Sequence, residues 1–177
     1  MNELEKVQEA EYFLGRMITS REIRDAFRFN LSAFLSAARS VLQYAREEAR
    51  PQPGGQAWYD GHMAASRILT FFKDRRDVNV HVKPVALRAD IGVHATERIR
   101  LTESVTIEIF EGGQLVGRHE SPPGQPELEP ADEPATISTV YTFSDWAGVE
   151  DVFQLSRQYL NEVKAVVADG QKRGYLT

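Results

Sequence analysis

The chain has 177 residues, 42% hydrophobic and 27% charged, which is typical of one globular domain or of one core with an insertion. It contains no cysteine, which excludes disulfides, thiolate zinc sites and a cysteine nucleophile. The net charge of −5 is not that of a general nucleic-acid binder. The acidic N-terminus is unlike a signal peptide, and the most apolar stretch, 31–38, is too short to span a bilayer. We therefore expect a cytoplasmic protein with no membrane partner.

The first part of the chain predicts helices. Apolar residues over 3–17 have the spacing of a short amphipathic helix, and steps of three and four predict one long helix over 23–50. Neither Gly nor Pro interrupts that long pattern, and the Pro- and Gly-rich segment 51–55 ends it. A further helix is predicted over about 57–76, with basic residues in its last turn, where the helix dipole favours them.

Arg39 lies in the middle of the long predicted helix, among small residues that permit close approach of another helix. A charge that faces such a contact needs a partner, such as an acid on the first or the last helix. The alternative is that Arg39 points to solvent.

The apolar period changes after residue 82. Alternation over 85–93 predicts a strand, 103–120 is predicted to form a hairpin around Gly112-Gly113, and 137–143 offers a last strand. Residues 121–134 hold five of the eight prolines together with four acids, so we predict a mobile acidic loop there.

A helical pattern over 144–170 follows, and its apolar face must be buried against the other helices, the sheet or both. The predicted fold class is α+β: a helical bundle with a small antiparallel β-sheet inserted before the C-terminal helix. The expected divisions are a bundle over 1–82, the β insertion over 83–143, and a C-terminal helix in 144–177 that packs back on the bundle, the sheet or both.

Candidate chemistry gathers where the predicted third helix ends. The segment 67–88 has six basic residues against two acids, a local balance of +4, so an anion-binding face is expected there. Its candidate anion-binding residues are Arg75, Lys73 and Lys83. The alternative is structural, with the arginines satisfying the last helix carbonyls and His81 lying in a turn.

These helices together resemble the HEPN superfamily of all-helical, usually dimeric bundles. The resemblance is carried by 34–40 in the long helix, by Trp58-Tyr59, and by the run 71–81. It covers roughly residues 1–82 and leaves the β insertion unexplained. The family signature is an arginine, a following Asn, His or Asp, and a histidine a few residues later; Arg76, Asp77 and His81 match it.

The resemblance implies a metal-independent endoribonuclease of the toxin or defence type as one function. Arg76 would clamp the scissile phosphate, His81 would shuttle a proton between the ribose 2′-hydroxyl and the leaving oxygen, and Asp77 would orient one of them. A two-fold axis would bring the motifs of two protomers into one cleft. Lys83 stands where one toxin subgroup has a tyrosine, so regulation by modification of that tyrosine is not expected.

Three functions stay open from the sequence. The first is a homodimeric HEPN-like binding or interaction module, with an anion- or RNA-binding cleft at Arg76–His81 and an unidentified protein as a further candidate partner. The second is the ribonuclease, and the third is a purely structural assembly protein that dimerises through the 31–45 helix face. The four histidines lack metal-ligand spacing, so neither a metal nor a cofactor is expected.

Overall fold

The computed structural model describes residues 2–81, 86–94, 98–100, 105–121, 127–129 and 136–177, and describes only the backbone at 2, 78–81, 94, 98–100, 105, 121, 127–129 and 136. The chain divides into a helical unit, residues 1–91 with 139–177, and a β unit, residues 92–138. The α+β fold is confirmed, and every described strand lies between the fourth and the fifth helix in the sequence.

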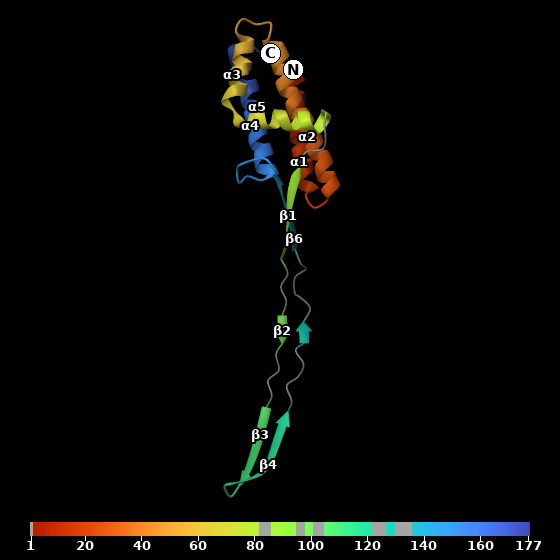
Figure 1. Cartoon of the computed structure of the whole chain (residues 1–177), viewed down its shortest axis with the longest axis vertical. Helices are drawn as coiled ribbons and strands as arrows, with labels where there is room; N and C mark the ends of the chain where they lie inside the picture. The colour runs from red at the N-terminus through yellow and green to blue at the C-terminus, as the bar shows by residue number, and fades with distance from the viewer. Residues whose placement is uncertain (1, 82–85, 95–97, 101–104, 122–126, 130–135) are drawn as a thin grey trace. The chain divides into compact units, whose positions relative to one another are not determined.

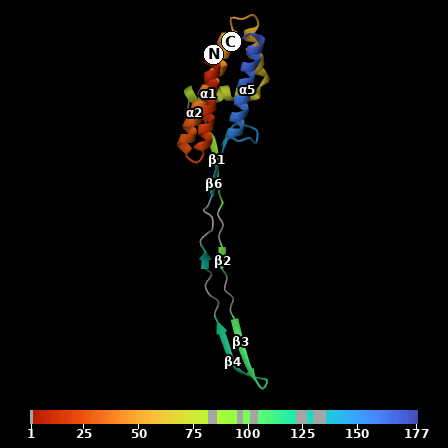
Figure 2. The same cartoon turned by 180° about the vertical axis from the view of Figure 1, so that it is seen from behind.

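Among the described residues, the helical unit contains five helices (Figures 1 and 2). They are α1 (Asn2–Thr19), α2 (Arg24–Ala49), α3 (Gly55–Ala65), α4 (Arg67–His81) and α5 (Val152–Arg173). Helices α1 and α2 pack side by side, α5 packs on α1, α2 and α4, and α4 crosses the others. The C-terminal helix thus returns to the N-terminal helices.

The apolar face of α2 forms the centre of this unit. Phe34, Leu35, Val41 and Leu42 are at most 1% exposed. Tyr159 of α5 stacks on Phe72 of α4 at 4.3 Å between ring centroids, and both rings meet Phe34 of α2 edge-on, so α2, α4 and α5 share one aromatic core. The 31–45 face is therefore filled by the chain's own helices, which leaves it few apolar side chains to offer a second copy.

The single helix predicted over 57–76 is wrong, because Ser66 divides it into α3 and α4. Ser66 has an extended backbone, and its hydroxyl oxygen accepts the N–H of Leu69 at 2.9 Å, as an N-cap does. The same hydroxyl donates to the carboxylate of Glu162 on α5. The break lets α4 turn across α2, and the helix then continues to His81 rather than ending at Arg76.

The final helix also has different bounds from those predicted. It begins at Val152, where Asp151 and Gln154 form a capping box: the Asp151 carboxylate accepts the Gln154 N–H and the Gln154 side chain accepts the Asp151 N–H. It runs past Gly170 to Arg173. Residues 144–150 precede it as a connection from the last strand.

The strands pair in a nested order, first with last. They are β1 (Leu87–His94), β2 (Arg98–Arg100), β3 (Val105–Glu111), β4 (Gln114–Ser121), β5 (Glu127–Glu129) and β6 (Thr136–Phe143). β1 pairs with β6, β2 with β5 and β3 with β4. The predicted hairpin is confirmed, and Gly112 and Gly113 have φ of 59° and 81°, the left-handed values that a two-residue hairpin turn requires.

Strand β5 lies inside the segment predicted to be a mobile loop, so that prediction is wrong for 127–129. Its antiparallel register with β2 places Arg98 opposite Glu129 and Arg100 opposite Glu127. Of the rest of the predicted loop, residue 121 is the end of β4, and 122–126 and 130–134 lie outside the described residues.

Candidate functional site

Within α4 the structure brings together only part of the predicted motif. Arg76 Nη1 lies 3.2 Å from Asp77 Oδ1, and Lys73 Nζ lies 3.7 Å from Asp77 Oδ2. Arg75 instead pairs with Asp145, which follows β6 in the chain. Arg75 and Arg76 therefore each pair with a carboxylate of this chain.

The predicted catalytic histidine is the last residue of α4, and its side chain is outside the described residues, as is all of Lys83. On one α-helix, positions 76 and 81 lie about 140° apart around the axis, whereas 77 and 81 lie on one face. Positions 76 and 81 therefore lie on different faces of α4.

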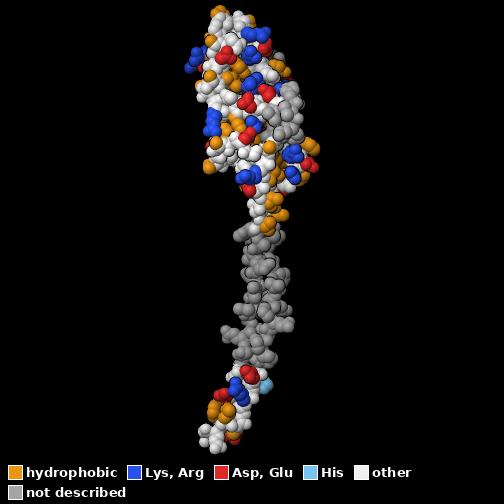
Figure 3. All heavy atoms as spheres, viewed as in Figure 1, with side chains coloured by type: hydrophobic (Ala, Val, Ile, Leu, Met, Phe, Trp, Pro, Cys, Tyr) orange, Lys and Arg blue, Asp and Glu red, His pale blue; other side chains and the backbone are white. Residues whose placement is uncertain are grey.

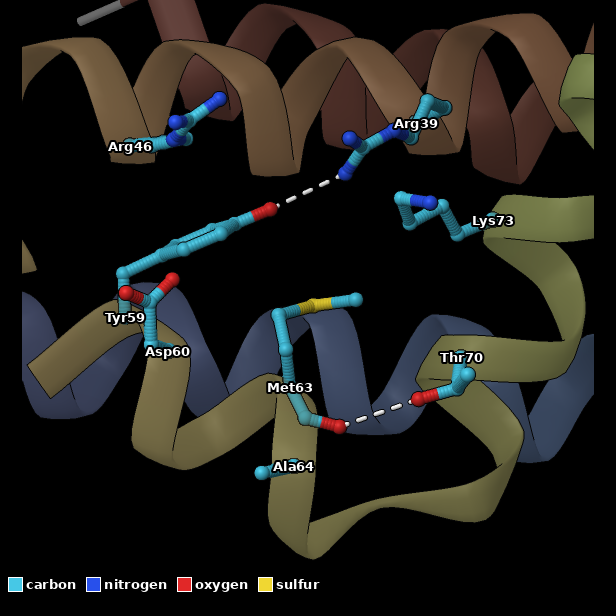
Figure 4. A pocket seen from close by; sticks show the side chains of 8 residues that line it. All are labelled: Arg39, Arg46, Tyr59, Asp60, Met63, Ala64, Thr70 and Lys73. Carbon is cyan, nitrogen blue, oxygen red and sulfur yellow. Dashed lines mark hydrogen bonds between the residues drawn. The ribbon is translucent and has the colours of Figure 1, made fainter. Parts of the chain in front are cut away.

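A pocket of about 420 Å³ opens where α2, α3 and α4 meet (Figure 4). Its lining comprises Arg39 and Arg46 of α2, Tyr59, Asp60, Met63 and Ala64 of α3, and Thr70 and Lys73 of α4. The Thr70 hydroxyl donates to the Met63 carbonyl at 3.1 Å and so fastens α4 to the end of α3. The Ser66 break therefore creates the corner in which this pocket lies.

Arg39 forms the floor of the pocket and is only 8% exposed. Its Nη1 donates to the Tyr59 hydroxyl at 3.0 Å, and its Nε is buried without a hydrogen-bond partner in the part of the chain that the structure describes. Among the described residues, Arg39 pairs with no carboxylate. Both predictions for Arg39 are wrong, because it neither pairs with an acid of the first or last helix nor points to solvent: α3 supplies a neutral hydroxyl instead.

Two further cations lie at the rim of the pocket. Arg46 is seven residues after Arg39 on α2, which puts it on the same helix face about 10 Å along the axis. Lys73 enters from α4, beside Arg39 in Figure 4. Asp60 is the single acid of the lining, so three cations face one carboxylate, a balance of +2. The chain has 26 acids and 21 basic residues, so this excess of positive charge does not reflect a shortage of acids.

The buried side chains near Arg39 do not neutralise it. Tyr159 is fully buried, and burial raises the pKa of its phenol far above the usual range, although the charge of Arg39 opposes that shift. Tyr159 thus stays a neutral phenol at physiological pH. Its hydroxyl has no hydrogen-bond partner within the part of the chain that the structure describes. The positive charge of Arg39 remains uncompensated.

A second polar cluster joins α3 to α5 and is internally complete. The Asp169 carboxylate accepts the Trp58 indole N–H at 2.7 Å, a His62 ring nitrogen lies 2.9 Å from it, and Arg173 Nε donates to it at 2.9 Å. These bonds, that of Trp58 foremost, hold the pKa of Asp169 far below its usual range. A hollow of about 340 Å³ lies beside them, but Asp169 is already occupied by donors of this chain. This cluster is a clamp between helices.

Sequence reasoning identified Arg39 and Lys73 but not the pocket that they share. The spacing of Arg39 and Arg46 by seven residues was the available signal, because it puts two cations on one face of a long helix. Within residues 2–81 and the other described ranges, no group of three potential metal ligands occurs, and no helix has the length and apolarity to cross a membrane.

Comparison of the chain with protein-family models, with curated proteins and with solved structures finds no match. The HEPN resemblance therefore stays a prediction that rests on the residues of 34–40, 58–59 and 71–81.

Proposed function

We propose that this protein is a binding module that receives an anionic group in the pocket floored by Arg39. The observation that carries the proposal is the buried guanidinium with no carboxylate partner among the described residues. An uncompensated buried charge costs stability, and proteins keep such groups where function requires them. A bound anion would supply the missing charge.

The pocket is preorganised for binding an anion. The Tyr59 hydroxyl fixes one terminal nitrogen of Arg39, so little side-chain freedom is left to lose on binding. The planar end of the guanidinium can donate to two oxygens of a phosphate or carboxylate at once. Lys73 adds a third charged donor after leaving Asp74 and Asp77, both of which it contacts only at 3.7 Å.

The experiment is a titration of the full chain with inorganic phosphate, followed by NMR chemical shifts. We expect Arg39→Met to weaken phosphate binding at least tenfold. Arg50→Met is the matched control, since it removes the same charge from the C-cap position of α2, outside the pocket, and its affinity should stay within about twofold of wild type. Equal affinity of Arg39→Met and wild type would rule out this site.

The ribonuclease is the second candidate, and one observation favours it. Asp77 shares a helix face with position 81, and Lys73 links Asp77 to the cationic pocket. This function also requires a homodimer with RNA in a shared cleft, because positions 76 and 81 diverge on one helix. RNA is incubated with wild type and with His81→Ala in the presence of chelator, and cleavage lost in the variant would support the enzyme. No cleavage by either protein would leave the binding module alone.

A further inference from the structure

We infer that the ligand of the Arg39 pocket is a small amphiphilic anion, in which one phosphate or carboxylate head is joined to a compact apolar body. The inference rests on the proposed function and names the class of molecule that the site would take. It also distinguishes this ligand from a strand of nucleic acid, which carries a charge at every nucleotide.

The position of the cations argues for a single anionic head. Arg39 is only 8% exposed, whereas Arg46 is exposed and Lys73 half-buried, so the group that contacts Arg39 must be a narrow end of the ligand. The neighbouring cations of α4 are paired with carboxylates, Arg75 with Asp145 and Arg76 with Asp77. They do not form the continuous line of free cations that follows a phosphodiester backbone.

The surface charges of the helical unit also argue against a nucleic-acid strand as the ligand. On the face of the helical unit seen in Figure 3, basic and acidic side chains are interspersed and no broad basic patch gathers. A polyanion approaching this face would meet repulsion beside each attraction. An anion small enough to enter the pocket meets the +2 balance of the lining alone.

The wall of the pocket argues for an apolar body. Met63 is half-buried, and its side chain extends into the space between Tyr59 and Lys73 (Figure 4). Ala64 continues that apolar wall away from the floor. Thioethers pack favourably against both aromatic and aliphatic groups. The volume of about 420 Å³ lies at the lower end of the range of small-molecule sites, which limits the body to one ring or a short chain.

The test compares ligands that share a head and differ in their body. The full chain is titrated with inorganic phosphate, phenyl phosphate, acetate, benzoate and a short single-stranded RNA. We expect each aromatic anion to bind about tenfold tighter than its small counterpart, since about 50 Å² of apolar surface buried on the Met63 wall is worth roughly that factor. The better of the two aromatic anions identifies the preferred head.

Met63→Ala separates the contribution of the apolar wall to ligand affinity from the contribution of the cations. It should reduce the tenfold advantage of phenyl phosphate to threefold or less and leave the affinity for inorganic phosphate unchanged. Leu115→Ala, which removes an exposed apolar side chain of the β unit, is the matched control and should change neither affinity.

The outcomes separate the inference from the function on which it rests. If phosphate and phenyl phosphate bind equally and both depend on Arg39, the apolar body is wrong and the anion site stands. If none of the anions binds, both fail. If RNA binds much more tightly than phenyl phosphate and Arg39→Met leaves that binding intact, the ligand is a polyanion at another surface and both are again overturned.

Discussion

The helical unit and the β unit have equally regular apolar patterns in the sequence, yet only the helical unit buries the apolar side chains that form its pattern. Phe72 of α4 is 0% exposed, whereas Phe110 of β3 is 59% exposed and Ile107 and Ile109 are each 53% exposed. The described strands of the β unit pair only two by two, so neither face has a second layer. Alternation predicts a strand correctly but does not show whether another element will cover it.

The same contrast explains where a binding site can be built. Arg39 is held in a fixed orientation because α2, α3 and α4 are joined by a shared core and by the Ser66 and Thr70 hydrogen bonds. Rigid elements position a charge more accurately than an uncovered two-stranded ribbon does. The candidate site therefore lies in the unit with the continuous core.

The largest expected difference between the two units is in the stability lost when a phenylalanine is replaced by alanine. Phe72→Ala removes a ring that stacks on Tyr159 and meets Phe34 edge-on, so it should lower the free energy of unfolding by about 3–5 kcal/mol. Phe110→Ala, the matched change in the β unit, should lower it by less than about 0.5 kcal/mol. Urea denaturation measures both, and similar losses would show that the β unit is covered in solution.

A smaller change in stability is expected when either of two glycines of α3 is replaced by alanine. A Cβ at Gly55 would lie 1.9 Å from the Ala49 carbonyl oxygen, so Gly55→Ala should cost about 1–3 kcal/mol of stability by overpacking. A Cβ at Gly61 meets nothing within 4 Å, and Gly61→Ala should stabilise the protein by up to about 1 kcal/mol through helix propensity. Thermal unfolding of the two variants should move in opposite directions; a shared direction would contradict the α2–α3 packing.

The last prediction concerns the pH dependence of stability that arises from the Asp169 cluster between α3 and α5. Hydrogen bonds from Trp58, His62 and Arg173 lower the pKa of Asp169 in the folded protein below its value of about 3.9 in an unfolded chain. The stability that they contribute is complete above about pH 4 and is lost as the pH falls further, because the unfolded chain then binds the proton more readily. Wild type should exceed Asp169→Asn in unfolding free energy at neutral pH, with a gap that narrows in acid. A constant gap would disprove the coupling.

Local signals predicted much of the fold. The uninterrupted apolar stripe of α2 and the paired glycines at 112–113 act within a few residues, so the sequence shows them directly. Ser66 was missed because its capping role competes with a helical pattern on both sides, and Glu162, 96 residues later, helps to hold it. Strand β5 was missed because only its facing partner, β2, makes an acidic Pro-rich segment extended.

The site could be predicted only in part, for a similar reason. The sequence showed that Arg39 needed an explanation and that Lys73 lay in a basic segment. It could not show that Tyr59 would meet Arg39, because that contact depends on the angle at which α3 returns from the turn after Arg50. The pocket is a property of three helices, and no single helix encodes it.

The most direct test of the account is the stability of Arg39→Met in the absence of any anion, measured by urea denaturation. If Arg39 is kept for binding, replacing its uncompensated buried charge by an apolar side chain of similar length should leave the free energy of unfolding unchanged or raise it by about 1–2 kcal/mol. A loss of 2 kcal/mol or more, on the order of a broken buried interaction, would show that Arg39 serves to hold Tyr59 and the helices together, and would contradict the account.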